Sequence, residues 1–352
     1  MPDEMSNVLN QSSQDLGEGG DQRSCPGCSS SSVARILTVN EMMFGSSEHF
    51  RYIECDGCGT LRLANVPDDL GMYYPRTYYS VADDPQLVLG RRGVRSVIKV
   101  VGRSALGGSN AVAGAVGKTV GRREVQTLLS IYSSLRASGQ SAKSSSRVLD
   151  VGAGSGMLVY ALSLAGFGDV VGIDPFADGD RVFDTGASIR TESLGQMSGP
   201  GAWDMIMFNH SFEHVADPRA DLAAALELLA PGGAILVRMP TVSSWAWRKY
   251  GVEWVQLDAP RHLTLFSRKG MTALAESVGL KIYQTRDDST AFQFWGSEQV
   301  IKKIALDAPN SHMVNEKQSP FSAQQIKEWA ARAVELNAAG DGDQVAWIMG
   351  RS

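Results

Sequence analysis

The chain has 352 residues, of which 43% are hydrophobic and 20% are charged, and its formal net charge at pH 7 is −5. This length accommodates one large domain with a smaller one, or two medium domains, and the composition is that of an ordinary globular protein. A net acidic charge argues against a general nucleic-acid binder, because phosphate binding favours a basic surface.

The N-terminal residues 1–22 are polar and rich in Ser, Gly and Gln, which predicts a disordered tail. They contain acids and no apolar stretch, a pattern that does not fit a secretory signal. The sequence also has no run of about 18 apolar residues that could form a transmembrane helix. We therefore expect a cytoplasmic protein without a transmembrane segment.

The four cysteines of the chain stand in two C-x2-C pairs, within SCPGC and ECDGCG. One such pair can give two thiolates to a tetrahedral zinc ion, and a second pair completes the coordination. Residues 32–41 and 49–55, between the pairs, read as strands. We expect a zinc-ribbon-like module over residues 23–80, with a structural zinc ion held by Cys25, Cys28, Cys55 and Cys58. A disulfide arrangement is the alternative, which a reducing cytoplasm disfavours.

A basic segment follows, since residues 85–123 contain eight Lys or Arg residues and no acid. Basic residues recur every four positions from 91 to 103, which places them in one stripe on a helix beside a largely apolar face. The stripe at 91–103 fits contact with an anionic surface, such as lipid head groups or a phosphorylated substrate. The alternative is a helix packed on the main domain. Together with the glycine-rich residues 107–121, the segment 81–123 predicts a linker or a lid.

From residue 124 to residue 352, strands alternate with helices of 10–15 residues, which predicts an α/β domain with a mostly parallel sheet and helices on both faces. A strand from residue 147 leads through a glycine-rich turn into a helix. Further strands are expected at 170–174, 188–192, 203–211, 234–240, 281–285 and 344–351. Further helices are expected at 124–137, 217–231, 267–280 and 321–340, and Asp217 followed by Pro218 is typical of a helix start.

The turn after the first of these strands contains Gly152, Gly154 and Gly156. Small residues there let the backbone approach a ligand, and the following helix presents free N–H groups. Met157 departs from the dinucleotide fingerprint, which needs Gly or Ala at that position. Asp174 closes the second strand and is placed to accept hydrogen bonds from two ribose hydroxyls. A nicotinamide cofactor and a nucleoside-methionine cofactor could both use such an acid.

The ordered motifs LDVGAGSG, VGIDP, WDMIMFNHSFEHV and LLAPGGAILVRMP resemble those of class I S-adenosylmethionine-dependent methyltransferases. The chain is most similar to the branch with an N-terminal four-cysteine zinc element, found among methyltransferases of sugar, glycan and natural-product pathways. YYPRTYYS and LDAPRHLTLFS resemble the same branch. The resemblance covers residues 23–80 and 124–352. It implies a Rossmann-like, seven-stranded sheet, S-adenosylmethionine as cofactor and structural zinc.

The resemblance also implies cofactor-binding roles at matching positions. The first strand and the turn would hold the methionine and ribose end, the second strand the ribose hydroxyls, the third strand the adenine and the fourth strand the sulfonium. The residues concerned are Asp150, Gly152, Ala153, Gly154 and Gly156, then Asp174 and Pro175, then Glu192, Ser193 and Leu194, and then Asn209 and His210. Ser193 stands where the family usually has a second acid, a departure at the adenine contact.

Three residues are candidates for the chemistry on the acceptor. A hydroxyl acceptor needs a general base, and histidine is the usual one near pH 7. His262 follows the fifth strand on the side where open α/β sheets bind ligands, and His214 follows the fourth strand. Arg261 either clamps a phosphate or carboxylate of the acceptor or forms an internal ion pair with Asp258. Aromatic residues upstream form either the wall of an acceptor pocket or a cover over the sheet edge, namely Trp245, Trp247, Tyr250 and Trp254.

The sequence therefore predicts transfer of a methyl group from S-adenosylmethionine to a small molecule. The expected acceptor is a hydroxyl of a sugar, a nucleotide-sugar, a lipid-linked glycan or a secondary metabolite. C-methylation of a keto-sugar nucleotide is one alternative. An RNA-binding or RNA-modifying zinc protein is the alternative from another class, and the acidic charge and the lack of a basic patch interleaved with aromatics disfavour it.

Overall fold

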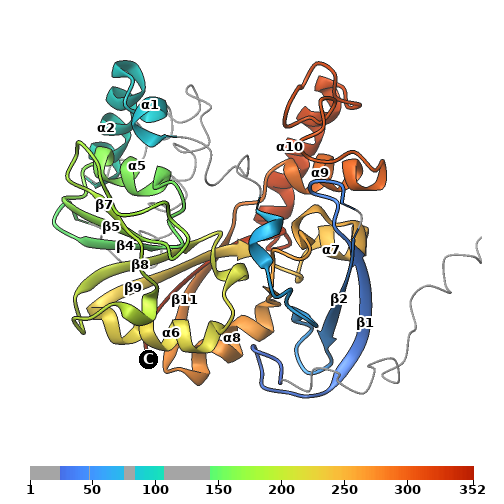
Figure 1. The fold of residues 1–352 in the computed structure, drawn as a ribbon, viewed down its shortest axis with the longest axis horizontal. Coiled ribbons are helices and arrows are strands. Elements are labelled where there is room, and N and C mark those ends of the chain that lie inside the picture. Colours follow the sequence, from blue (N-terminus) through green and yellow to red (C-terminus); the bar gives the residue numbers. More distant parts are fainter. Residues whose placement is uncertain (1–23, 47, 75–83, 107–142) are drawn as a thin grey trace, which may run out of the picture.

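The structure is a computed structural model of the chain, and it describes residues 24–46, 48–74, 84–106 and 143–352 (Figure 1). The predicted tail over 1–22, the glycine-rich stretch 107–121 and the predicted helix 124–137 lie outside the described residues.

A mixed, mostly parallel sheet forms the larger part of the molecule. Its eight strands run in the order β11-β12-β9-β8-β4-β5-β7-β6. They are β4 (Arg147–Val151), β5 (Asp169–Ile173), β6 (Arg181–Val182), β7 (Ser188–Arg190), β8 (Trp203–Asn209), β9 (Leu229–Pro240), β11 (Leu280–Asp287) and β12 (Gln344–Arg351). Strands β7, β5, β4, β8 and β9 pair in parallel, and β12 lies antiparallel between β9 and β11. The predicted α/β fold is confirmed.

The sheet has one strand more than the seven that were expected. The extra strand is β6, which pairs antiparallel with β7 at the sheet edge over two residues. The chain can fold back here because Gly186, between the two strands, has a φ of +88°, a conformation that favours glycine.

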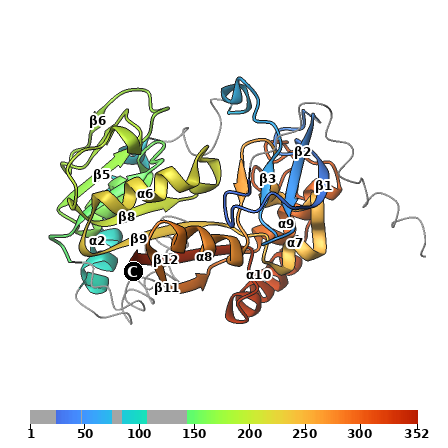
Figure 2. The same ribbon diagram turned by 90° about the horizontal axis from the view of Figure 1, so that it is seen from below.

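Helices cover both faces of the sheet, as expected (Figures 1 and 2). On one face lie α1 (Pro85–Leu89), α2 (Arg92–Leu106) and α5 (Met157–Ala165), and their apolar residues share a core with β4 and β5. On the other face lie α6 (Pro218–Leu228) and α8 (Arg268–Ser277), which share a second core with β8 and β9. Parallel strands require this double cover, because both of their faces are apolar.

The start of α6 agrees with the sequence prediction. Asp217 caps the helix by accepting a hydrogen bond from the backbone N–H of Ala220, and Pro218 is the first helical residue. The helix ends at Leu228, earlier than expected, since Gly232 was predicted to lie just beyond its end. Strand β9 begins earlier than expected, since Leu229 already pairs with Trp203 of β8.

The basic segment is helical where it is described. In α2, Ile98 and Val101 are buried against α5, while Lys99 and Arg103 are exposed. Arg95 forms an ion pair with Asp184 at 2.7 Å. These contacts favour the packed-helix alternative for residues 91–103, and contact with an anionic surface stays a prediction.

A second, smaller sheet is antiparallel and has the order β1-β2-β3-β10. Its strands are β1 (Val33–Asn40), β2 (His49–Cys55), β3 (Leu61–Leu63) and β10 (Thr264–Leu265). The first two confirm the strands predicted between the cysteine pairs. The fourth strand comes from a segment some 200 residues later in the chain, so β10 ties the cysteine module to the remainder of the protein.

The small sheet packs on α7 (Trp245–Tyr250), and α9 (Phe292–Ile301) and α10 (Ala323–Ala338) form a further small core beside α7 (Figure 1). Trp247 and Trp254 are buried in the core between β2 and α7. Trp254 also donates a hydrogen bond from Nε1 to Asp343 at 3.0 Å. The burial of these two tryptophans favours the structural alternative, and a place in the wall of an acceptor pocket stays a prediction. Within the described parts of the chain, no helix has the length and apolar character needed to cross a membrane.

Candidate active site and candidate metal centre

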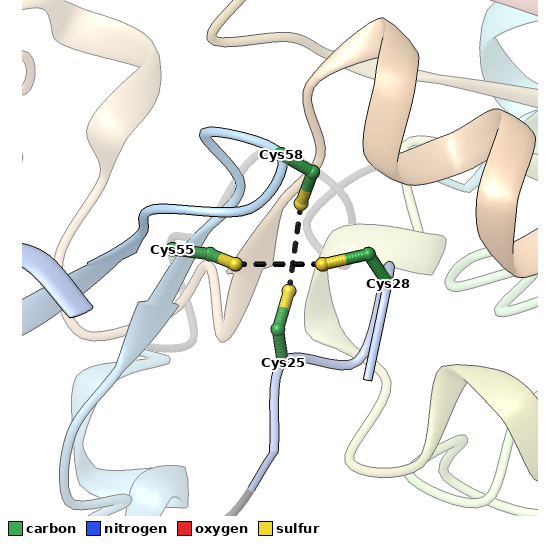
Figure 3. Close-up of side chains that lie close together, drawn as sticks. All are labelled: Cys25, Cys28, Cys55 and Cys58. Atoms are coloured by element: carbon green, nitrogen blue, oxygen red, sulfur yellow. Dashed lines mark hydrogen bonds between the residues drawn. The ribbon is translucent and has the colours of Figure 1, made fainter. Parts of the chain in front are cut away.

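The four cysteines converge at one point of the small module, as Figure 3 shows. The Sγ atoms of Cys25 and Cys58 lie 3.6 Å apart, and those of Cys28 and Cys55 lie 3.5 Å apart. A disulfide needs about 2.05 Å between its sulfurs, and all four thiols are free. Two thiolates on a tetrahedral zinc ion lie about 3.8 Å apart. The donor set and its spacing therefore fit the predicted zinc ion.

The cysteine centre is held against the start of α8. Ser267, the N-cap of this helix, donates a hydrogen bond from Oγ to the carbonyl of Cys58 at 2.5 Å, and Lys269 donates from Nζ to the carbonyl of Gly57 at 2.7 Å. A Cβ at Gly270 would lie 2.1 Å from Oγ1 of Thr60, so only glycine allows this approach. The centre thus fixes the position of α8 against the small sheet.

The predicted cofactor residues gather around the carboxyl ends of neighbouring strands, which is where open α/β sheets bind their ligands. Those ends belong to β4, β5, β7 and β8. The residues are Asp150, Gly152, Ala153, Gly154, Gly156, Asp174, Pro175, Glu192, Ser193, Leu194, Asn209 and His210. We refer to this group as the cofactor end.

The glycine turn is built from left-handed backbone and close contacts. Gly152, with a φ of +75°, donates its N–H to the carbonyl of Ile173 at 2.8 Å. A Cβ at Gly152 would lie 2.5 Å from Cβ of Ser211, and a Cβ at Gly156 would lie 2.4 Å from Cδ1 of Ile189. Side chains at either position would thus collide with the walls of the turn, which explains the glycine spacing.

Two carboxylates lie beside this turn. Asp174 accepts hydrogen bonds from the N–H of Gly154 at 2.8 Å and from the N–H of Phe176 at 2.9 Å, one on each oxygen. Each carboxylate oxygen retains capacity to accept a further bond. Asp150 is only 3% exposed, and burial, followed by the neighbouring Asp174 charge, raises its pKa to about 8.

The predicted adenine contacts follow β7. Glu192 lies 3.5 Å from the guanidinium of Arg190, and Ser193 begins a 3-10 turn in which its N–H is bonded to the side chain of Gln196 at 2.7 Å. Leu194 is buried in the core with β8. Binding of adenine by these residues stays a prediction.

Arg238 in β9 is a residue of this region that was not predicted from the sequence. Its Nη1 donates to Nε2 of His210 at 2.7 Å and to Oδ1 of Asn209 at 3.2 Å, and its Nε donates to Asp288 at 2.7 Å. It thereby fixes both residues predicted to line the sulfonium. A charged residue inside the apolar strand AILVRMP was the available signal, because a buried arginine requires partners.

The candidate bases lie together beyond β8, in what we call the acceptor cluster: Glu213, His214, Asp258, Arg261 and His262. Nε2 of His262 lies 3.9 Å from Oε1 of Glu213 and 3.7 Å from Oδ2 of Asp258. The His214 and His262 rings are in edge-to-face contact, with centroids 4.9 Å apart. Two histidines predicted separately as bases are therefore neighbours in one site.

Burial shifts the pKa values of Glu213 and of the two histidines in this cluster. Glu213 is 1% exposed, and burial raises its pKa to about 8. Burial lowers the pKa of His262 and that of His214 below the ordinary value for histidine. Nδ1 of His262 lies 2.7 Å from the carbonyl of Gln256, and Nδ1 of His214 lies 2.8 Å from the carbonyl of Arg261. Since a carbonyl only accepts, each Nδ1 carries the ring proton and each Nε2 keeps a lone pair.

Arg261 is 1% exposed and has several protein partners. Its Nη2 contacts Asp258 at 2.6 Å and Glu41 at 2.7 Å, and its Nη1 donates to the carbonyl of Tyr73 at 3.1 Å. Its guanidinium also lies over the ring of Phe44. These contacts favour the internal ion pair over the acceptor clamp, and they tie the loop to the small module.

Two residues of the small module, Glu41 and Tyr52, hold the cluster in place and were not predicted from the sequence. Glu41 is 1% exposed, and the hydroxyl of Tyr52 donates to the carbonyl of His262 at 2.7 Å. Their separation from the cluster, at 220 and 210 residues, explains why no local pattern revealed them.

Comparison with known proteins agrees with this geometry. Residues 122–285 match a family model described as a methyltransferase domain. Among curated proteins, a ubiquinone biosynthesis O-methyltransferase of Caulobacter sp. (strain K31) is 31% identical over 120 residues, 31% of this chain and 47% of that protein. The corresponding protein of Cereibacter sphaeroides is 34% identical over 127 residues, 33% of this chain and 50% of that protein. The chain thus spans about half the length of these relatives.

Solved structures are more distant. A geranyl diphosphate C-methyltransferase from Streptomyces coelicolor A3(2) has 14% identity and a TM-score of 0.40, over 65% of this chain and 81% of that one. A SAM-dependent methyltransferase from Archaeoglobus fulgidus has 16% identity and a TM-score of 0.38, over 62% and 92%. Likeness at this level carries nothing about substrates. Residues 122–285 are thus similar to a methyltransferase domain, and the strand order and the glycine turn agree with that match.

Proposed function

We propose that this protein transfers a methyl group from S-adenosylmethionine to an oxygen atom of a small molecule. One observation carries the proposal: Asp174 is held between two backbone N–H groups at the end of β5, beside the glycine turn that ends β4. A carboxylate fixed in this way suits the two hydroxyls of a ribose, and the turn suits the adjoining methionine portion.

The cofactor end fits this cofactor in shape and in charge. The space beside Gly152 and Gly156 admits no side chain, so the backbone itself lines the turn. S-adenosylmethionine carries a positive sulfonium, and its methyl group is the one transferred. Asp150 is buried near Asp174 with a raised pKa, so a cationic ligand would relieve the repulsion between the two acids. Asn209 and His210, both fixed by Arg238, would orient the reacting end.

The acceptor cluster supplies the second requirement of the reaction. Methyl transfer depends on holding the nucleophile in line with the methyl group in a dry site. A hydroxyl also has to lose its proton as it attacks. His262 is 4% exposed and neutral near pH 7, with its Nε2 lone pair available. We propose His262 as this base, and the adjacent His214 as the second candidate.

For the acceptor, we propose a hydroxyl of a sugar, a nucleotide-sugar, a lipid-linked glycan or a secondary metabolite. The curated relatives are named as O-methyltransferases, which supports an oxygen acceptor. For the cysteine centre, we propose a structural zinc ion, because four thiolates leave no open position on the metal.

C-methylation of a keto-sugar is the second candidate. It is favoured by the pairing of an acid with two imidazoles in one cluster, since enolate formation needs a base and a group that steadies the oxyanion. The two reactions differ at the carbon next to the ketone, where only C-methylation removes a proton. Deuterium washout from that carbon therefore separates them.

The direct test is a methyl-donor assay with S-adenosylmethionine and pooled nucleotide-sugars and glycolipids, in which products are detected by mass. The proposal expects a product heavier than its acceptor by one CH₂, together with S-adenosylhomocysteine in equal amount. Cofactor turnover that produces no methylated acceptor from any pool would count against the proposed acceptor class.

A further inference from the structure

The acceptor cluster brings an imidazole nitrogen close to two buried acids. Nε2 of His262 has a lone pair, because Nδ1 of the same ring carries the proton. Facing it are Oε1 of Glu213 at 3.9 Å and Oδ2 of Asp258 at 3.7 Å. Oxygen atoms of carboxylates only accept unless they are protonated. Nδ1 of His210 also lies 3.5 Å from Oε1 of Glu213, whereas Oδ2 of Asp258 has no hydrogen-bond partner.

Two buried oxygens in this cluster have no hydrogen-bond partner. They are Oε2 of Glu213 and Oδ2 of Asp258, and the two residues are 1% and 7% exposed. Leaving a polar oxygen without a partner in the interior is costly. A cation bound between the acids and the imidazole would satisfy Oδ2 of Asp258, the unpartnered oxygen that lies 3.7 Å from Nε2 of His262.

The two histidines have the hydrogen bonds typical of metal ligands. Metal-binding imidazoles almost always donate their other ring N–H to a carbonyl or a carboxylate, which fixes the ring. Here Nδ1 of His262 donates to the carbonyl of Gln256, and Nδ1 of His214 donates to the carbonyl of Arg261. In both rings the lone pair of Nε2 is therefore available to bind a metal ion.

The spacing of these groups suits a first-row transition ion. One ligand atom from each of Glu213, His214 and His262 lies within 4.8 Å of the others. Two ligands on a tetrahedral ion of this kind lie about 3.4 Å apart. A contraction of a few tenths of an ångström would therefore bring His262 and the two acids to bonding distance.

We propose that Glu213, His214 and His262 bind a divalent transition-metal ion, with Asp258 as a further oxygen ligand. Two imidazoles with a carboxylate form a donor set for zinc and for iron(II). The larger part of the site is buried, and His214 is its partly exposed member, so an ion or an acceptor oxygen would enter past this ring.

Metal binding would change one step of the proposed function. An ion on Nε2 of His262 occupies the lone pair that would otherwise take the acceptor's proton. The ion would then polarise the acceptor oxygen directly, which is a general role of bound divalent metals. The inference itself concerns binding alone, and its test requires neither cofactor nor acceptor. A failure of metal binding is thus distinct from a failure of methyl transfer.

The test measures the metal content of the full chain by inductively coupled plasma mass spectrometry. The protein is first loaded with Zn²⁺ or, in the absence of oxygen, with Fe²⁺, and loosely held ions are then removed. We expect one ion at the cysteine centre and a second ion at the cluster. His262→Gln and Glu213→Gln should each lose the second ion and keep the first. Loading with Co²⁺ distinguishes the two positions, because only the cysteine centre gives thiolate-to-metal absorption.

Matched controls are available outside the cluster. His49 and Asp341 lie elsewhere on the molecule, and His49→Gln and Asp341→Asn should retain both ions. If His262→Gln also loses the cysteine-bound ion, this variant has misfolded. His214→Gln, at the partly exposed position, then tests whether the second ion is lost while the first is kept. The inference is overturned if the folded wild-type chain holds only the cysteine-bound ion under every loading. It is equally overturned if the second ion persists in all the cluster variants.

Discussion

The cofactor end and the acceptor cluster are assembled in different ways. At the cofactor end, backbone N–H groups and acids meet across neighbouring strands, and the bond from Gly154 to Asp174 joins residues only 20 positions apart. In the acceptor cluster, buried charges meet across the chain, and the bond from Arg261 to Glu41 spans 220 positions. The first region depends on the local path of the backbone, and the second depends on the docking of the small module.

This difference predicts how each region responds to substitution. Changes at the cofactor end should alter ligand affinity with limited effect on the fold. Changes in the acceptor cluster should affect stability and chemistry together, because the same buried groups hold the module and, in the proposed function, face the acceptor.

The largest effect is expected at Arg261. Arg261→Met would leave Asp258 and Glu41 buried without their cation, and the removal of one partner from a buried pair costs about 3–5 kcal/mol. Chemical denaturation measures the loss. Arg248→Met, at an exposed pair with Asp341, is the control and should cost about 0–1 kcal/mol. A stable Arg261→Met chain with only a raised KM would instead indicate an acceptor clamp.

A smaller effect, on turnover, is expected at His262. His262→Ala should slow methyl transfer at least about a hundredfold, the usual scale for loss of a general base, while affinity for S-adenosylmethionine stays near wild type. Steady-state kinetics and cofactor titration provide the two values, with the exposed His49→Ala as control. If the turnover of His262→Ala stays near that of wild type, His262 has a structural role and His214 becomes the leading candidate for the general base.

Gly152 tests the cofactor end. Gly152→Ala should lower stability by about 1–3 kcal/mol through overpacking and weaken cofactor binding, because the added Cβ meets Ser211 at 2.5 Å. Gly186→Ala is the matched control, since it has a φ of +88° and open space around its Cβ. This control measures the effect of backbone strain alone, without a collision of the added Cβ. Equal effects of the two substitutions would show that the close approach to Ser211 has no role.

The effect expected at Asp150 depends on pH. Its pKa is raised from 3.8 to about 8 in the folded chain. Between these values the folded chain holds a proton that the unfolded chain has released, so the free energy of unfolding falls as pH rises through this window. Asp150→Asn should therefore unfold at higher denaturant than wild type at pH 8, and the difference should shrink toward pH 4. If the stability difference between Asp150→Asn and wild type were the same at all pH values, the raised pKa of Asp150 would not be its cause.

The same contrast explains what the sequence could predict. The parallel strands, the glycine turn, Asp174 and the four cysteines follow from short-range patterns, since periodicity, turn residues and paired ligands are local properties. The start of α6 at Asp217 was predicted for the same reason. Binding roles at these positions stay proposals.

Three features could not be predicted. The two-residue strand β10 is defined only by its pairing with β3, which is far away in the chain. Burial of Trp254 depends on the docked small sheet, which no periodicity within 245–254 encodes. The choice between clamp and ion pair at Arg261 required Glu41, whose position relative to the loop is a tertiary property.

The central claim is that S-adenosylmethionine binds at the cofactor end through Asp174. Isothermal titration calorimetry of the full chain with S-adenosylmethionine tests it, with Asp174→Ala and the exposed-pair variant Asp341→Ala compared side by side. The account predicts saturable one-site binding that is retained in Asp341→Ala and weakened at least about tenfold in Asp174→Ala, corresponding to the loss of one or two charge-assisted hydrogen bonds. No binding to wild type, or equal affinity in the Asp174→Ala chain, would contradict it.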